Sequence, residues 1–157
     1  MQRKIGLESG HYRQENPLVL NTRSLYLYII LIAVLLSFVT NFGFSSLLEP
    51  FLFLKNNGSS FYPSFENTFL VSKEWWRLIT PTFLHFSLTH LIFNCLWIYI
   101  LGSKIEIIDG KEIFLTLFLF ASLSSNLGQY FLTGDYLFGG LSGAVYGLLG
   151  YCFILDL

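Results

Sequence analysis

Hydrophobic residues in this chain fall into four long segments separated by more polar stretches. The segments run over about residues 25–44, 83–102, 113–132 and 138–155. Each has roughly 18–20 residues, which in a helix rising about 1.5 Å per residue crosses a hydrocarbon layer about 30 Å thick. Lipid offers no partners to open backbone groups, so such segments must be helical. The pattern therefore predicts an all-α polytopic membrane protein with four transmembrane helices.

The connections between the segments differ in character. Residues 45–77 form a long link that is rich in aromatic side chains and interrupted by Pro50 and Pro63. A link surrounded by water would not need so much apolar surface, so we expect it to lie partly embedded at the membrane interface. The 103–112 loop is short and charged, and residues 133–137 form a tight polar turn.

Basic residues predict the orientation of the chain. We assign residues 1–23 as a polar tail and residues 24–157 as one membrane domain, and we expect no cleaved signal peptide. The tail carries four Lys/Arg and the 103–112 loop two, against three in the 45–77 link. The positive-inside rule then places the N-terminus in the cytoplasm and the long link outside. We expect an integral protein of a bacterial inner (plasma) membrane.

Composition agrees with the membrane assignment and limits the partners. The chain is 54% hydrophobic and 12% charged, whereas soluble domains carry about 25% charged residues. A net charge of −1 gives no basic field that would favour a nucleic acid partner. Cys95 and Cys152 both lie in apolar runs, so we interpret them as packing thiols and not as a disulfide. Nothing in the composition indicates a cofactor.

A few polar side chains lie within the hydrophobic segments. His85, His90 and Asn94 are expected in the early turns of the second helix and Ser142 in those of the fourth, at a common depth below the outer surface. Polar groups at this depth are costly and are usually paired or functional. The residues alone leave open hydrogen bonds between helices, a metal site, or a hydrolytic site built on Ser142. The third histidine, His11, lies in the tail, so a metal site would lack ligands and none is expected.

Glycines surround Ser142 at a regular spacing. Gly139, Gly143 and Gly147 are four residues apart, and such small residues let helices approach closely without any catalytic role. A nucleophile has the same need, because small neighbours leave room for a peptide backbone. The N–H of Ser142, near the start of a helix, would also be available to an oxyanion.

Two stretches of the chain together resemble the rhomboid intramembrane serine proteases. The family pattern of a Trp-Arg pair followed by H-x-x-x-x-H-x-x-x-N occurs in WWRLITPTFLHFSLTHLIFNCLWIYILG, and its G-x-S-G helix resembles GGLSGAVYGLLGY. Both stand in the family's order and spacing, and the resemblance covers roughly residues 25–155. It implies four helices of a six-helix rhomboid-type bundle, with an interfacial loop between helices 1 and 2.

The resemblance also implies a role for each matching residue. Ser142 matches the nucleophile, and His90 and Asn94 match the side chains that bind the oxyanion with the Ser142 amide. Gly140 matches the residue whose missing side chain lets the substrate approach. The implied supporting residues are Tyr146 against the catalytic histidine, His85 in a structural or hydration role, Trp76 and Arg77 anchoring the interfacial loop, Glu106 below the second helix, and Gly143 beside the nucleophile. The implied activity is cleavage of transmembrane protein substrates, within the lipid bilayer, near the outer end of their helices.

One part of the family's machinery has no counterpart in this sequence. The family's base is a histidine on the sixth helix, and no histidine follows His90 here. His90 is needed on the oxyanion side and is a poor candidate for both roles. We therefore expect this chain, interpreted as a truncated rhomboid protease, to be inactive alone. The alternatives are a non-catalytic rhomboid-like protein that binds transmembrane segments, and an unrelated helix bundle; the combination of Ser142 with His90 and Asn94 favours the protease.

Overall fold

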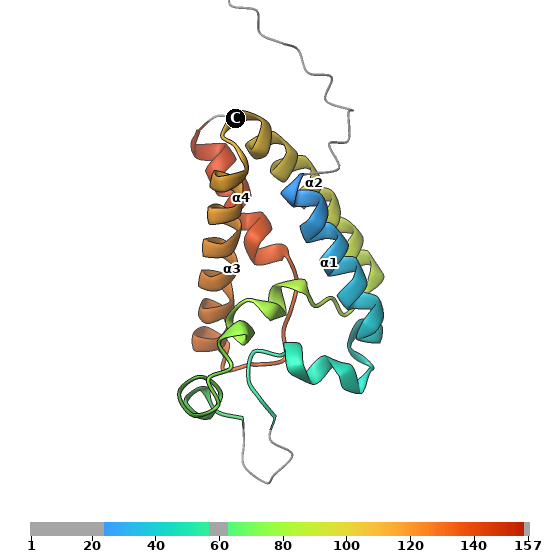
Figure 1. Cartoon of the computed structure of the whole chain (residues 1–157), viewed down its shortest axis with the longest axis vertical. Coiled ribbons are helices and arrows are strands. Elements are labelled where there is room, and N and C mark those ends of the chain that lie inside the picture. The colour runs from blue at the N-terminus through green and yellow to red at the C-terminus, as the bar shows by residue number, and fades with distance from the viewer. Residues whose placement is uncertain (1–23, 57–62, 156–157) are drawn as a thin grey trace, which may run out of the picture.

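Each of the four hydrophobic segments corresponds to one α-helix, but the second helix continues to Ile108, so the prediction of a loop over 103–112 is wrong for most of that stretch. The computed structural model describes residues 24–56 and 63–155, so the predicted tail over 1–23 lies outside the described residues. The helices are α1 (Leu25–Val39), α2 (Leu88–Ile108), α3 (Lys111–Thr133) and α4 (Ser142–Ile154). They run lengthwise through the molecule, and the connection from α1 to α2 crosses one end of it (Figure 1). The described residues are thus all-helical, as the sequence predicts.

Helix α2 begins later than the hydrophobic pattern suggests. The preceding loop ends in a separate short 3-10 helix over Thr80–Phe83, which contains Pro81. Ser87 then caps α2, because its hydroxyl accepts a hydrogen bond from the N–H of His90 at 3.3 Å. The helix therefore starts at Leu88 instead of about residue 83. The prediction that His85 lies in an early turn of this helix is wrong; it lies in the loop before it.

Helices α1 and α4 are shorter than the segments that contain them. α1 ends at Val39 because Asn41 and Phe42 adopt positive φ angles of 47° and 51°, which cannot continue a right-handed helix. α4 begins only at Ser142, two residues after Gly140, whose φ angle is 132°. The start of α4 thus falls on the candidate nucleophile itself.

The core lies where α4 meets α2 and α3. α4 packs against both helices, and α1 packs against α2 on the other side. α1 contributes to the same cluster, whose fully buried side chains are Ala33 of α1, Ile98 and Ile105 of α2, Phe114 of α3, Leu141 before α4, and Ala144 and Leu148 of α4. One long-range polar contact fixes α1, since the Glu106 carboxylate accepts a hydrogen bond from the Tyr26 N–H at 2.9 Å. A carboxylate at the first turn of a helix also opposes the positive end of its dipole favourably.

Two helices are long and apolar enough to cross a membrane. They are α2 and α3, and in their most apolar windows only 33% and 22% of the residues are buried within the protein. The core helix of a soluble protein would be mostly buried, so these exposed apolar faces suit contact with lipid. α1 and α4 are apolar but shorter. The outward-facing side chains of α2 and α3 include Ile92, Phe93, Leu96, Ile100, Leu119 and Phe120.

Gly147 allows α3 and α4 to touch, and this contact can be tested. A Cβ at Gly147 would overlap the Cβ of Ala121, whereas a Cβ at Gly150 would meet nothing within 4 Å. We expect Gly147→Ala to lower the free energy of unfolding by about 1–3 kcal/mol, because a short alanine side chain cannot move aside. The matched control Gly150→Ala should be neutral or stabilise by up to about 1 kcal/mol through helix propensity. Unfolding in detergent measures both; equal stability of the two variants would contradict the contact.

Candidate active site

The segment before α4 lies against the turn before α2. The Gly140 N–H donates to the Pro81 carbonyl oxygen at 3.1 Å. A Cβ at Gly139 would lie 2.6 Å from the Leu84 Cβ and 2.9 Å from the carbonyl oxygens of both Leu84 and Pro81. Backbone oxygens cannot move aside as a flexible side chain can, so position 139 requires glycine. This contact places the start of α4 beside the start of α2.

His90 and Ser142 face the same space in front of Gly140. A Cβ at Gly140 would lie 2.6 Å from Cε1 and 3.0 Å from Nε2 of His90, and 3.5 Å from Oγ of Ser142. The imidazole therefore packs against Gly140 in space that a side chain at this position would need, and the Ser142 hydroxyl lies close to the same point. Ser142 is also the first residue of α4, so its N–H has no acceptor within the helix.

Asn94 joins this group through His85. The Asn94 Nδ2 and His85 Nε2 atoms are 3.3 Å apart, and the Leu141 N–H donates to the same His85 nitrogen at 3.5 Å. The ring centroids of His85 and His90 are 5.1 Å apart, and the two ring planes are inclined at 63°. Asn94 and His85 are buried, while His90 is only half-buried. The structure thus gathers all four polar residues that the sequence singled out around the start of α4.

Two of the other implied site residues lie on different faces of α4. A Cβ at Gly143 would overlap the Ser125 side chain, so Gly143 packs against α3. Tyr146 is 73% exposed, on a face that the described helices do not cover. Tyr146 is therefore not packed against His85 or His90, and its implied packing against a catalytic histidine stays a prediction.

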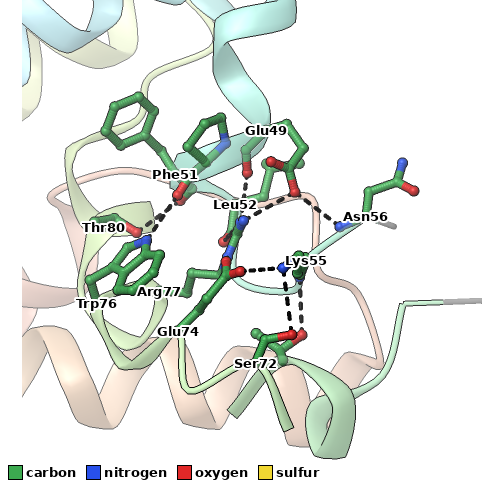
Figure 2. Close-up of polar contacts among 12 residues, drawn as sticks. Glu49, Phe51, Leu52, Lys55, Asn56, Ser72, Glu74, Trp76, Arg77 and Thr80 are labelled. Carbon is green, nitrogen blue, oxygen red and sulfur yellow. Dashed lines mark hydrogen bonds and ion pairs between the residues drawn. The ribbon is translucent and has the colours of Figure 1, made fainter. Parts of the chain in front are cut away.

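Arg77 organises the loop between α1 and α2 (Figure 2). Its guanidinium is 2% exposed, yet it donates four hydrogen bonds. The acceptors are the Glu74 carboxylate at 2.6 Å, the Glu49 carbonyl at 2.6 Å, the Leu52 carbonyl at 2.9 Å and the Glu49 carboxylate at 3.1 Å. A planar guanidinium can satisfy several acceptors in this way, while an ammonium cannot. The link thus has an ordered polar centre, although its sequence suggests mainly apolar surface.

Glu74 and Trp76 complete this polar centre. Burial disfavours the charged form of Glu74, but Lys55 at 2.5 Å and Arg77 outweigh that effect and hold the pKa of the carboxyl below its ordinary value. The Trp76 Nε1–H donates to the Pro50 carbonyl at 3.3 Å. Trp76 and Arg77 therefore both bind backbone carbonyls of the 49–52 segment, which is the contact that an anchoring pair would make.

Asn126 of α3 is a positioning residue that the sequence reasoning missed. Its Nδ2 donates to the Leu78 carbonyl at 2.8 Å and to the Thr82 hydroxyl at 3.1 Å. It thereby ties α3 to the turn that carries Pro81, next to the candidate site. The available signal was an amide within an apolar helix, at four-residue spacing on the face that Phe114 and Phe118 also occupy.

Metal ligands are not grouped in this site. Among residues 24–56 and 63–155, no three His, Cys, Asp or Glu side chains lie close enough together to hold an ion. The groups near Ser142 are hydrogen-bond donors and one imidazole pair. Such a set is suited to stabilising negative charge on a reacting oxygen.

Comparison with known proteins points in the same direction. The family model described as Rhomboid domain matches residues 72–157. The chain is 40% identical over 91 residues to the putative rhomboid protease YdcA of Bacillus subtilis, a match that covers 57% of this chain and 46% of YdcA. It is 40% identical over 95 residues to the rhomboid protease GlpG of Haemophilus influenzae, covering 60% of this chain and 47% of GlpG. The rhomboid protease GluP of Bacillus subtilis is 38% identical over 85 residues, 54% of this chain and 17% of GluP. The matches thus span about half, or less, of the length of these relatives.

Proposed function

Because this chain belongs to the rhomboid family of intramembrane proteases, we propose that Ser142 is the nucleophile of a serine endopeptidase site for transmembrane helices. The observation that carries the proposal is the arrangement around Gly140, where the His90 ring and Ser142 Oγ both lie close to the position that a side chain would occupy. A scissile carbonyl that approached the Ser142 hydroxyl would therefore meet the His90 imidazole beside it. Cleavage would then fall near the outer end of the substrate helix.

The proposed oxyanion donors are Asn94, His90 and the Ser142 N–H. Attack on an amide carbonyl places negative charge on its oxygen, and each aimed donor of this kind contributes about 3–4 kcal/mol in soluble serine proteases. The start of α4 supplies the backbone N–H, because the first amides of a helix have no intrahelical acceptor. The proposed role of Gly140 is that its missing side chain lets the substrate approach, and a side chain there would also collide with the His90 ring.

A chimera tests whether these residues supply the nucleophile. Residues 72–157 would replace the matched stretch of Haemophilus influenzae GlpG, and cleavage of a transmembrane reporter would be followed by gel mobility. We expect cleavage that Ser142→Ala abolishes, and that Gly150→Ala leaves intact, since Gly150 has open space around it. A chimera that is monodisperse in detergent but cleaves nothing would contradict the assignment, as would cleavage that survives Ser142→Ala.

The proposed topology places all four helices across a bacterial inner membrane as one domain over residues 24–157. The tail and the α2–α3 loop would face the cytoplasm, and the α1–α2 link and the turn before α4 would face outward. Single cysteines at Lys104 and Asp135 test this, in a background lacking Cys95 and Cys152. An impermeant maleimide added to intact cells should label Asp135→Cys, and Lys104→Cys only after permeabilisation. Labelling of both from the same side would contradict four spans.

A further inference from the structure

We propose that His85 is a positioning residue, held as the neutral tautomer with its proton on Nδ1, which turns the amide nitrogen of Asn94 toward the start of α4. The proposal deepens the proposed function, because it concerns how an oxyanion donor is aimed. The tautomer itself, however, can be established whether or not the chain belongs to an active protease. His85 is 1% exposed, so its ring nitrogens depend on the protein for their partners.

Two backbone groups of fixed polarity select the tautomer. The Phe83 carbonyl, which can only accept, lies 3.3 Å from Nδ1 of His85. The Leu141 N–H, which can only donate, points at Nε2 at 3.5 Å. A backbone carbonyl and a backbone amide cannot exchange roles, and they meet opposite nitrogens of one ring. Both require the proton on Nδ1 and the lone pair on Nε2.

Ser37 of α1 agrees with this assignment. Its hydroxyl donates to the Ala33 carbonyl at 2.7 Å, so its one hydrogen is already used. Oγ of Ser37 therefore presents only lone pairs to Nδ1 of His85, which lies 3.4 Å away. A hydroxyl in this state accepts, and the Nδ1–H is shared between Ser37 and Phe83. Three partners from three separate segments thus give the same answer.

The tautomer decides which end of the Asn94 amide faces His85. Nε2 carries a lone pair, so its neighbour at 3.3 Å must be the amide nitrogen and not the carbonyl oxygen. The Leu141 N–H reaches the same lone pair from the start of α4, so the nitrogen of Asn94 is turned toward that side. Within residues 24–56 and 63–155, this is the one hydrogen bond that the Asn94 side chain makes. One N–H of Asn94 is thereby held and its second remains for an oxyanion.

The opposite arrangement would harm the site. With the proton on Nε2, the ring would face the Leu141 N–H donor to donor, and Nδ1 would present a lone pair to the Phe83 carbonyl. The amide of Asn94 would then turn its oxygen toward His85. A carbonyl oxygen turned toward the start of α4 would repel a developing oxyanion where a donor is needed. His85 thus acts on the chemistry only through Asn94.

Histidine ¹⁵N NMR of the 157-residue chain in detergent or nanodiscs tests the tautomer directly. The chain has three histidines, and His11→Gln and His90→Gln assign the spectrum. We expect His85 at neutral pH to show a protonated Nδ1 and an unprotonated Nε2. A protonated Nε2, whether in the other neutral tautomer or in an imidazolium, would overturn the proposal. This readout needs no proteolysis, so it can fail while the proposed function stands, and the reverse.

Two variants test the link to Asn94. Asn94→Ala should keep the tautomer, because Phe83 and Leu141 still select it, but should shift the Nε2 resonance away from the protonated region, since its lone pair then accepts one bond fewer. Ser142→Ala serves as the control and should leave the Nε2 resonance in place, because Ser142 does not contact His85. An Nε2 resonance unchanged by Asn94→Ala would overturn the proposed orientation of the amide.

Discussion

A serine-reactive fluorophosphonate probe is expected to leave the 157-residue chain unlabelled. A serine hydroxyl is a weak nucleophile near neutral pH and needs a base that takes its proton. Loss of the base in a soluble serine protease lowers kcat by about 10⁴–10⁶-fold, and we expect a deficit of at least about 10⁴-fold in the labelling rate here. The donors of the site do not substitute for this step, because they act on the oxyanion and not on the nucleophile.

The two described histidines near Ser142 both have other hydrogen-bonding roles, so neither is available as a base. His85 has acceptors at Nδ1 and donors at Nε2, so neither nitrogen has a free lone pair for the Ser142 proton. The His90 ring packs against Gly140 near Ser142 and is proposed as an oxyanion donor there. The third histidine, His11, lies outside the described residues. A base for Ser142 must therefore come from residues other than 24–56 and 63–155.

In-gel fluorescence measures this prediction, with the chimera described above as the positive sample. The chimera should label within the time in which the 157-residue chain does not, and its Ser142→Ala variant should lose the signal. Labelling of the 157-residue chain that disappears in its own Ser142→Ala variant would show that the site is complete without a further base. That outcome would refute the prediction and would make His90 the candidate base.

The sequence was informative where hydrophobic periodicity or a motif carried the signal. The four helices correspond to the four apolar segments, because only helices satisfy the backbone in lipid, although α2 continues past its segment to Ile108. Ser142, His90 and Asn94 were identified from their spacing, and the structure brings them to one place. The helix boundaries were less accurate: α2 begins at Leu88 because the cap at Ser87 decides its start, and a hydropathy pattern does not register a cap.

The contacts that position the site were not visible in the sequence. Asn126 and Ser37 contact residues 44 to 48 positions away in the chain, at separations that no local pattern links. Glu74 binds Arg77 only three residues on, but its second cation, Lys55, comes from the other part of the link. The role of His85 likewise depends on the backbone carbonyl of Phe83 and the backbone N–H of Leu141. Almost any residue type would offer the same backbone groups, so the sequence does not reveal them. Motifs indicate which side chains meet the substrate, while the residues that aim them emerge only from packing.

Arg77→Ala is expected to destabilise the chain more than any other single change in the α1–α2 link. The substitution removes four hydrogen bonds and leaves the buried carboxylate of Glu74 with Lys55 as its only cationic partner. The Leu52 carbonyl also loses its donor, and the Glu49 carbonyl keeps the Leu52 N–H at 3.2 Å but loses the guanidinium. Removing one partner of a buried ion pair costs about 3–5 kcal/mol, because the other charge stays behind without compensation. We expect a loss of this size in the free energy of unfolding.

Two control variants separate the charge of Arg77 from its shape. Lys55→Ala removes the other cation beside Glu74, but the Lys55 side chain is 34% exposed, so it should cost no more than about 1 kcal/mol. Arg77→Lys retains the charge while losing the fork that reaches both carboxylates and both carbonyls, and should fall between the two. Unfolding in mixed micelles gives the three values. If Arg77→Ala lowered the free energy of unfolding no more than Lys55→Ala does, the guanidinium would not stabilise the link. The order of the 49–52 segment would then have to come from its apolar contacts alone.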